Sequence, residues 1–359
     1  MFIFSFVHHI KNSYFSTNYP FMNLITGGTG LVGSHLLLLL LEKGECVRAI
    51  YRTENSKNKT KTLFELYKKE HLYSKIEWVQ ADINDTPSLE RAFEEVLYVY
   101  HCAAYVSLSS SDNKMYKINI EGTANMVNLS IDFDIKKFCY VSSIAALGTP
   151  ENPTAVITED TEWNPNSNNT DYAITKHGGE MEVFRGSQEG LEVVVVNPGI
   201  ILGPEFWNHG SARFFEKVKK GMLFYTKGKS GFVAVTDVVR AMYELMKSEI
   251  KSKRFILIAT NLSLQDFLNK IAYSVKAKNP QYYAKPWLTN LGATADKIFP
   301  VLFFKKRSLT RSMSDSAHSQ TVFSNQKIKT TLNFEFTDTT QYINQIGKYY
   351  LETNKRKYF

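Results

Sequence analysis

Strand patterns and helix patterns alternate regularly over the first two thirds of this chain. Strands that alternate with helices form parallel sheets. The runs are almost continuously apolar, which is typical of strands with helices on both faces. The expected strands are Asn23–Thr26, Cys46–Tyr51, Ile76–Gln80, Val96–His101, Phe138–Ser142 and Val193–Asn197. The expected helices are Leu31–Lys43, Pro87–Phe93, Asn113–Phe133, Asp171–Gln188 and Val235–Ser248. The pattern predicts an α/β fold with a doubly wound parallel sheet.

A glycine-rich turn follows the first expected strand and opens the first expected helix. Gly27 allows a tight turn, Gly30 lets the backbone approach a pyrophosphate, and Gly33 lets the helix and strand pack closely. The free amides of the helix N-terminus suit the negative charge of the phosphates. The pattern predicts a Rossmann-type site for a dinucleotide. The expected contacts in this turn are Gly27, Thr29, Gly30, Leu31, Val32 and Gly33.

The spacing Gly-x-x-Gly-x-x-Gly resembles the short-chain dehydrogenase/reductase superfamily. The length and motifs resemble its extended branch, the NAD-dependent epimerase/dehydratase family, and above all its dihydroflavonol reductase-like and 3β-hydroxysteroid dehydrogenase-like members. The resemblance covers most of residues 22–260. It implies further cofactor contacts after the third, fourth and sixth strands, for the adenine, the dinucleotide backbone and the nicotinamide. These are Asp82, Ile83, Ala103, Ala104, Pro198, Gly199 and Ile200.

The end of the second expected strand bears on the choice between NAD and NADP. NAD enzymes usually carry an acidic residue there for the ribose hydroxyls, whereas this chain has Arg52. A guanidinium binds phosphate through two hydrogen bonds, so Arg52 suits the 2′-phosphate of NADP, with help from Lys57 or Lys59. The alternative is that Arg52 is a solvated residue at a strand end. We expect NADP as the cofactor, with NAD as the alternative.

A Tyr-x-x-x-Lys pattern near the start of the fourth expected helix indicates acid–base chemistry. The spacing places Tyr172 and Lys176 on one helix face. A free tyrosine has a pKa of about 10 and is a poor base at neutral pH, so a neighbouring ammonium is needed to stabilise the phenolate. The resemblance assigns Ser143 to polarise the substrate oxygen, with Ser142 as the neighbour that could be confused with it. It also assigns Asn119 to support the lysine through water.

These residues favour an oxidoreductase. Tyr172 would donate a proton to a carbonyl oxygen as hydride arrives, and would act in reverse during oxidation. The aromatic residues between Glu205 and Phe232 are either the wall of an apolar pocket or ordinary core. One alternative is a nucleotide-sugar epimerase or dehydratase with retained NAD and a basic diphosphate clamp that includes Arg213. Another is an NADP-binding regulator without turnover, although such relatives usually lack the Tyr-Lys pair.

The alternation weakens after about residue 200, which indicates a second region. We expect residues 22–200 and 233–260 to form the dinucleotide-binding domain, and residues 201–232 and 261–359 to form a smaller C-terminal substrate-binding region. Residues 1–21 precede a Met from which the first strand can begin. They are expected to be a disordered tail or a mis-assigned start.

Composition limits the remaining possibilities. The 359 residues carry a net charge of +8, with three cysteines and eight histidines in no metal-like arrangement. No apolar run approaches the ~20 residues of a membrane helix. The basic residues are dispersed along the sequence, with small clusters at Lys57–Lys61, Lys305–Arg307 and Lys355–Lys357, so a solvated face explains them best. We expect a cytoplasmic enzyme with a small-molecule substrate, no metal, no nucleic acid and no membrane span. The resemblance also allows a homodimer.

Overall fold

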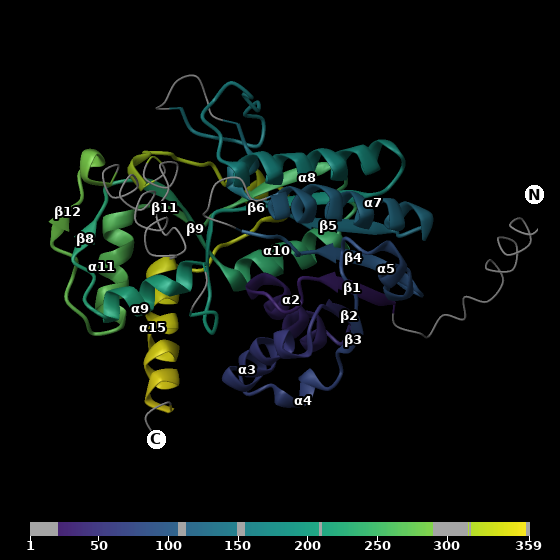
Figure 1. Ribbon diagram of the computed structural model, residues 1–359, viewed down its shortest axis with the longest axis horizontal. Helices are drawn as coiled ribbons and strands as arrows, with labels where there is room; N and C mark the ends of the chain where they lie inside the picture. The colour runs from purple at the N-terminus through teal and green to yellow at the C-terminus, as the bar shows by residue number, and fades with distance from the viewer. Residues whose placement is uncertain are drawn as a thin grey trace, which may run out of the picture.

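A parallel sheet of seven strands forms the centre of the molecule (Figure 1). The computed structural model describes residues 21–106, 113–148, 155–207, 210–289, 315 and 317–356. The strand order is β10-β6-β5-β4-β1-β2-β3. The strands are β1 (Met22–Thr26), β2 (Cys46–Tyr51), β3 (Glu77–Gln80), β4 (Val96–His101), β5 (Lys137–Val141), β6 (Val193–Pro198) and β10 (Lys253–Leu257). The six expected strands are confirmed to within a residue at each end, whereas β10 was not expected.

Helices cover both faces of this sheet, so the doubly wound α/β fold is confirmed. One face carries α2 (Leu31–Glu42), α3 (Asn58–Leu66), α4 (Glu70–Tyr73) and α10 (Val235–Lys247). The other carries α5 (Thr86–Phe93), α6 (Asn113–Tyr116), α7 (Gly122–Asp132) and α8 (Asp171–Gln188). The helix expected over residues 113–133 is interrupted by a π-helical turn, Lys117–Glu121. None of the described helices has the length and apolar character needed to cross a bilayer.

The alternation of side chains along each strand creates two hydrophobic cores. In β6, Val193 and Val195 belong to the core under α5 and α7, while Val194 and Val196 belong to the core under α2 and α10. All four valines have no exposed surface. Successive side chains of a strand point to opposite faces, so a run of valines serves both cores at once. Each fully buried valine contributes roughly 1.5–3 kcal/mol of transfer free energy.

A second, smaller group of elements packs beyond the carboxyl edge of the large sheet. A three-stranded sheet has the order β11-β9-β7, and a separate two-stranded ladder pairs β8 with β12. The elements are β7 (Ile200–Leu202), α9 (Arg213–Lys219), β8 (Phe224–Tyr225), β9 (Lys229–Ala234), β11 (Thr260–Ser263), α11 (Leu264–Ser274), β12 (Tyr282–Tyr283) and α15 (Thr339–Arg356). A further helix, α14 (Gln326–Leu332), packs against β10 of the large sheet.

Most of the aromatic residues between Glu205 and Phe232 lie in the core of this smaller group. Trp207, Phe215 and Phe232 are each at most 9% exposed and share a hydrophobic cluster with α11 and α15. Of the two interpretations of these aromatics, the structure therefore supports ordinary core for these three. The sequence could not separate the two, because a pocket wall and a core require the same residue types.

Asp237 joins the C-terminal segment to the large sheet. Its carboxylate is 2% exposed and accepts hydrogen bonds from the Thr337 amide (2.8 Å) and the Thr337 hydroxyl (2.9 Å). Arg240 forms an ion pair with the same carboxylate at 3.1 Å. A buried carboxylate is tolerated only where donors of this kind replace water.

We expect Asp237→Ala to lower the free energy of unfolding by about 2–4 kcal/mol, because it removes three partners of a buried charge and leaves their donors unsatisfied. Urea unfolding measures this loss. Asp132→Ala, at an exposed position at the end of α7, is the matched control and is expected to change stability by less than about 0.5 kcal/mol. Equal effects of the two substitutions would contradict a tethering role for Asp237.

Candidate active site

A cleft of about 430 Å³ lies at the carboxyl edge of the large sheet, where the strand order reverses between β1 and β4. Doubly wound sheets bind their ligands at this point, because the connections leave the sheet in opposite directions there. The walls come from the segments that follow β1, β2, β3 and β4. They bring together eight of the expected cofactor contacts: Gly27, Thr29, Gly30, Arg52, Asp82, Ile83, Ala103 and Ala104.

The three glycines of the turn have different surroundings. Gly27 has φ of +67°, and a Cβ there would lie 2.7 Å from the Ala103 nitrogen. A Cβ on Gly33 would lie 2.2 Å from the Gly27 carbonyl oxygen. Gly30, by contrast, has only that same carbonyl oxygen nearby, at 3.3 Å from its Cβ position. Gly27 and Gly33 are therefore required for packing, while Gly30 keeps the mouth of the cleft open.

The N-terminus of α2 opens onto this cleft, with Leu31 and Val32 in its first turn. Its N-cap residue, Gly30, has no side chain, so no side-chain hydrogen bond satisfies the first amides of the helix. These amides and the positive end of the helix dipole form a site for an anion. The open glycine and the uncapped helix together fit the pyrophosphate of a dinucleotide.

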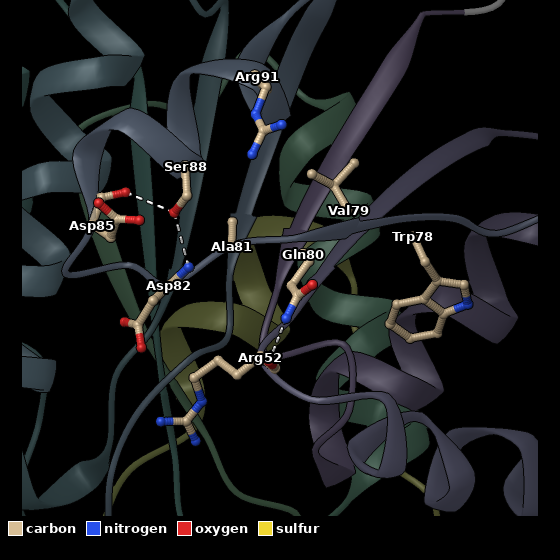
Figure 2. Close-up of a pocket in the computed structure, with 9 residues that line it drawn as sticks. All are labelled: Arg52, Trp78, Val79, Gln80, Ala81, Asp82, Asp85, Ser88 and Arg91. Atoms are coloured by element: carbon tan, nitrogen blue, oxygen red, sulfur yellow. Dashed lines mark hydrogen bonds between the residues drawn. The ribbon is translucent and has the colours of Figure 1, made fainter.

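Arg52 stands at the border between the cleft and a neighbouring hollow of about 730 Å³ along β3. Figure 2 shows its guanidinium extending away from the strand on the same side as Asp82, whereas Arg91 lies on the far side of Ala81. The Arg52 side chain is exposed and forms no ion pair with any described residue. A guanidinium in this state can bind an added phosphate group.

The two lysines expected to assist Arg52 have partners of their own. Lys57 forms an ion pair with Glu54 at 2.7 Å and lies over the Tyr51 ring at 4.3 Å. The Lys59 ammonium lies 5.7 Å from the centre of the Phe206 ring. Among the residues that the structure describes, Lys57 and Lys59 each have a charged or aromatic partner, whereas the Arg52 side chain has neither.

The loop after β3 is held from both sides. The Asp82 carboxylate accepts a hydrogen bond from the Asn84 amide (3.0 Å), which closes a turn. The Ile83 carbonyl accepts one from the Asn125 side chain of α7 (2.9 Å). Asp82 and Ile83 therefore form a fixed wall of the cleft.

Ser143 and Tyr172 meet at the same edge of the sheet, after β5 and at the start of α8. The Ser143 hydroxyl caps a short 3-10 helix by accepting a bond from the Ala145 amide (3.1 Å). It also lowers the pKa of the neighbouring Tyr172 phenol. The Ser142 hydroxyl, by contrast, is buried without a hydrogen-bond partner. The structure thus separates the two serines, which the motif could not do.

Burial raises the pKa of Tyr172 above its usual value, and the neighbouring Ser143 hydroxyl offsets this only in part. The phenol is consequently protonated at neutral pH. A protonated phenol beside a serine hydroxyl is the arrangement that donates a proton to a substrate oxygen.

Lys176 is almost fully buried, one helical turn after Tyr172, with 1% of its surface exposed. Its ammonium donates to the Tyr140 hydroxyl and to the Val141 carbonyl, both at 2.8 Å. Burial lowers the pKa of Lys176 to about 7, and the nearby Glu180 carboxylate opposes this shift. These bonds direct the ammonium to β5, and its expected pairing with Tyr172 stays a prediction.

Sequence reasoning missed Tyr140, because an aromatic residue in a strand has the pattern of core. Its hydroxyl needs the space left by Gly179, where a Cβ would lie 2.3 Å from that oxygen. The Tyr140 ring stacks on His101, with ring centres 5.6 Å apart and planes at 19°. Tyr140 is fully buried, so its hydroxyl depends on Lys176 for a hydrogen bond.

A buried polar chain continues from Tyr140 to the glycine-rich turn. His101 bonds Thr123 through Nε2 (3.1 Å) and Thr26 through Nδ1 (2.6 Å). The Thr26 hydroxyl accepts from the Ala103 amide (3.1 Å). Burial lowers the pKa of His101 to about 3, so the imidazole is neutral. The chain connects the lysine to the two segments that line the cleft.

Asn119 lies beside this chain but does not contact Lys176 directly. Its side chain accepts from the Tyr105 amide (2.7 Å) and donates to the Tyr105 carbonyl (3.0 Å) and the Thr175 hydroxyl (3.1 Å). Asn119, which lies in the π-helical turn, therefore fixes the segment after β4 against α8. Its expected support of the lysine through water stays a prediction.

A second group that sequence reasoning missed supports Ser143 from behind. The Asn197 amide donates to the Ser143 carbonyl (3.0 Å) and to the Glu180 carboxylate. Arg254 forms an ion pair with Glu180 at 3.2 Å, and both Asn197 and Glu180 have no exposed surface. No sequence motif predicts this group, because its members come from three separate elements: α8, β6 and the unexpected strand β10.

Gly199, in the segment expected beside the nicotinamide, is required by close packing. A Cβ on Gly199 would lie 2.4 Å from the Gly231 carbonyl oxygen, where the two sheets meet. Pro198 ends β6 and Ile200 begins β7, which pairs with Phe232. These three residues are not part of the 430 Å³ cleft, and their contact with the ring stays a prediction.

No group of three or more His, Cys, Asp or Glu side chains in the described part of the chain is arranged to hold a metal ion. Residues 23–259 match the NAD dependent epimerase/dehydratase family. The chain belongs to this family. Its fold and its glycine-rich cleft are those of an NAD(P)-dependent enzyme, so the predicted extended short-chain dehydrogenase/reductase fold is confirmed.

Relatives and solved structures of several activities resemble the protein. Sterol demethylase protein B of Methylococcus capsulatus is 27% identical over 79% of this chain and 84% of the relative. A putative dihydroflavonol 4-reductase of Synechocystis is 27% identical over 74% and 75%. UDP-glucose 4-epimerase of Thermotoga maritima superposes with a TM-score of 0.74 over 93% of this chain and 99% of that one, at 21% identity. This last likeness concerns the fold alone.

We expect the stability of the cofactor-free protein to rise between pH 7 and pH 10. The folded chain holds Lys176 with a pKa of about 7, against 10.5 for a free lysine, so the unfolded chain binds more protons in this range. Lys176→Met removes this effect. The free energy of unfolding of the variant minus that of wild type should be larger (more stabilising) at pH 6 than at pH 10 by about 2–4 kcal/mol.

Chemical denaturation at a series of pH values measures this difference. Lys68→Met, at an exposed position, is the matched control. Its free energy of unfolding should differ from that of wild type by the same amount at every pH. A difference for Lys176→Met that does not change with pH would mean that the ammonium is not held in a buried site.

Proposed function

We propose that the protein is an NADP-dependent oxidoreductase that reduces a carbonyl group, or oxidises the corresponding alcohol, of a small and mostly apolar substrate. The observation that carries the proposal is the position of Ser143 and Tyr172 at the carboxyl edge of the sheet that also forms the glycine-rich cleft, with Tyr172 one turn before the buried Lys176. Family membership supports the use of a nicotinamide cofactor.

In this proposal Tyr172 is the acid of the reduction. A bound nicotinamide nucleotide supplies the hydride. Ser143 orients the substrate oxygen, and the Tyr172 phenol gives its proton to that oxygen as negative charge develops on it. Lys176 keeps a positive charge near the phenol after the proton has left, and Tyr140 holds the ammonium in place. In the oxidative direction the same groups act in reverse.

The preference for NADP rests on Arg52. The glycines and the uncapped helix N-terminus would hold the pyrophosphate, and Asp82 with Ile83 would border the adenine. Arg52 would then face the ribose of the adenosine half, where a 2′-phosphate adds negative charge for its guanidinium.

The substrate class rests on the relatives and on the second region. The names of two relatives indicate sterol and dihydroflavonol chemistry, which involves largely apolar ring systems. We propose that residues 201–232 and 261–359 cover the substrate and that residues 22–200 and 233–260 bind the cofactor. A nucleotide sugar, the alternative substrate, would require a diphosphate clamp, and Arg213 is the exposed residue proposed for it.

We expect Tyr172→Phe to abolish NADPH-dependent reduction of apolar ketones or aldehydes, lowering kcat at least about 100-fold, because it removes the proton donor. NADPH affinity should stay within a few fold of wild type. Tyr273→Phe, an 80% exposed tyrosine on α11, is the matched control and should keep full activity. Tight endogenous NAD with no net consumption of nicotinamide would favour the epimerase alternative instead. NADPH binding without turnover of any substrate would favour the regulator.

We expect Arg52→Ser to weaken NADPH binding at least about tenfold and to leave NADH binding nearly unchanged, because only NADPH carries the 2′-phosphate. Fluorescence titration with the two nucleotides gives both constants. Arg91→Ser, across the neighbouring hollow, is the matched control (Figure 2). An equal loss for NADPH and NADH would contradict the assignment of Arg52.

A further inference from the structure

Large apolar side chains are exposed at one end of the molecule, on elements that carry none of the residues assigned to proton transfer. They come from β8, from β12 and from the segments next to them, which lie together in Figure 1 with α9 and α11. The exposed side chains are Leu223 (58%), Phe224 (47%), Tyr273 (80%), Tyr282 (57%) and Trp287 (64%). We call this region the β8–β12 surface.

The ladder between β8 and β12 fixes part of this surface. Phe224 pairs with Tyr282 in parallel register, and their ring centres lie 5.8 Å apart. The Leu223 carbonyl accepts hydrogen bonds from the Gln281 and Tyr282 amides, both at 3.0 Å. Tyr225, the next residue of β8, packs against the core shared by α9, α11 and α15. Because side chains alternate along a strand, Phe224 and Tyr282 point away from that core.

The same region has a strong excess of basic over acidic residues. Residues 213–227 and 273–287 contain eight basic residues and one acidic residue, a net charge of +7 in a chain whose total is +8. These two segments lie side by side, since Lys219 donates to the Val275 carbonyl (2.9 Å) and Lys227 lies over the Tyr283 ring (4.8 Å). The basic residues are Arg213, Lys217, Lys219, Lys220, Lys227, Lys276, Lys278 and Lys285.

We propose that the β8–β12 surface binds the face of a bilayer that contains anionic phospholipid. Trp and Tyr favour the boundary between water and acyl chains, because their rings are apolar and their N–H or O–H groups are polar. Lysines around them are attracted to anionic headgroups. The protein thereby rests on the bilayer through side chains, which is compatible with the absence of a spanning helix among the described residues.

The composition favours lipid over the other polyanionic or apolar partners. Seven of the eight basic residues are lysines, whereas protein–protein interfaces are depleted in lysine and enriched in arginine. Nucleic-acid sites use aromatic rings as stacking platforms, but an exposed leucine next to the rings, as at Leu223, contributes no stacking. An aliphatic side chain does gain from insertion among acyl chains.

The proposal is independent of the reaction assigned above, and its test uses no turnover. The full-length protein is sedimented with vesicles of phosphatidylcholine alone and with vesicles that contain 30% phosphatidylserine, in 0.1 M and 0.5 M NaCl. We expect binding to the phosphatidylserine vesicles that is at least about tenfold stronger than binding to phosphatidylcholine alone. The binding should weaken severalfold in the higher salt, because salt screens the lysines.

Two paired variants test the two parts of the surface. Lys276→Gln with Lys278→Gln should weaken binding to the phosphatidylserine vesicles about 25-fold, at about fivefold per lysine. Phe224→Ser with Tyr282→Ser should weaken it in both salt concentrations, because insertion of the rings does not depend on charge. Lys68→Gln with Lys75→Gln, at exposed positions on the far side near α3 and α4, is the matched control and should bind like wild type (Figure 1). Circular dichroism checks that each variant is folded.

Three outcomes would overturn the proposal. One is a wild-type protein that does not sediment with phosphatidylserine vesicles in 0.1 M NaCl. Another is an equal loss of binding in the Lys276/Lys278 variant and in the Lys68/Lys75 control, which would indicate attraction by net charge alone. The third is binding to single-stranded RNA that exceeds vesicle binding and persists in the Phe224/Tyr282 variant, which would assign the surface to nucleic acid.

Discussion

The burial of one ammonium group governs the arrangement of the whole candidate site. Lys176 is enclosed between α8 and the end of β5, and a buried charge is tolerated only with strong hydrogen-bond partners. Those partners come from β5, through the Tyr140 hydroxyl and the Val141 carbonyl. Gly179 leaves room for that hydroxyl, and the carboxylate of Glu180 lies close enough to favour the charged form. The packing of α8 on the sheet therefore also determines the position of the Lys176 ammonium.

The same helix sets the position of the proton donor relative to the cofactor cleft. Tyr172 lies one turn before Lys176, and its hydroxyl meets Ser143 because β5 ends at the carboxyl edge of the sheet. Asn197 and Glu180 hold the Ser143 backbone from behind, and Arg254 on β10 completes that group. The polar chain through His101 reaches the glycine-rich turn. The proton donor and the cleft therefore lie at the same edge of the sheet, on segments that follow neighbouring strands.

Much of the fold followed from local patterns. The strands of the large sheet could be predicted because each carries apolar residues on both of its faces. In β6, for example, Val193 and Val195 alternate with Val194. The turn at Gly27 was readable because a positive φ and close packing exclude other residues. The strand β10 was missed, because its first residues, Lys253 and Arg254, are charged and the alternation with helices had already weakened. The partners of Lys176 were missed as well, because they depend on which strand end faces α8.

Most strands and helices, the glycine-rich turn and the Tyr-Lys spacing could be predicted before the fold was known, because each depends on residues that are neighbours along the chain. The contacts of Lys176, the environments of the two serines and the burial of most aromatics near Trp207 depend instead on packing between distant segments. The position of many lysines on the surface also depends on the fold. Lysines that are dispersed in the sequence gather around Phe224 and Tyr282, because the pairing of β8 with β12 brings together segments some sixty residues apart.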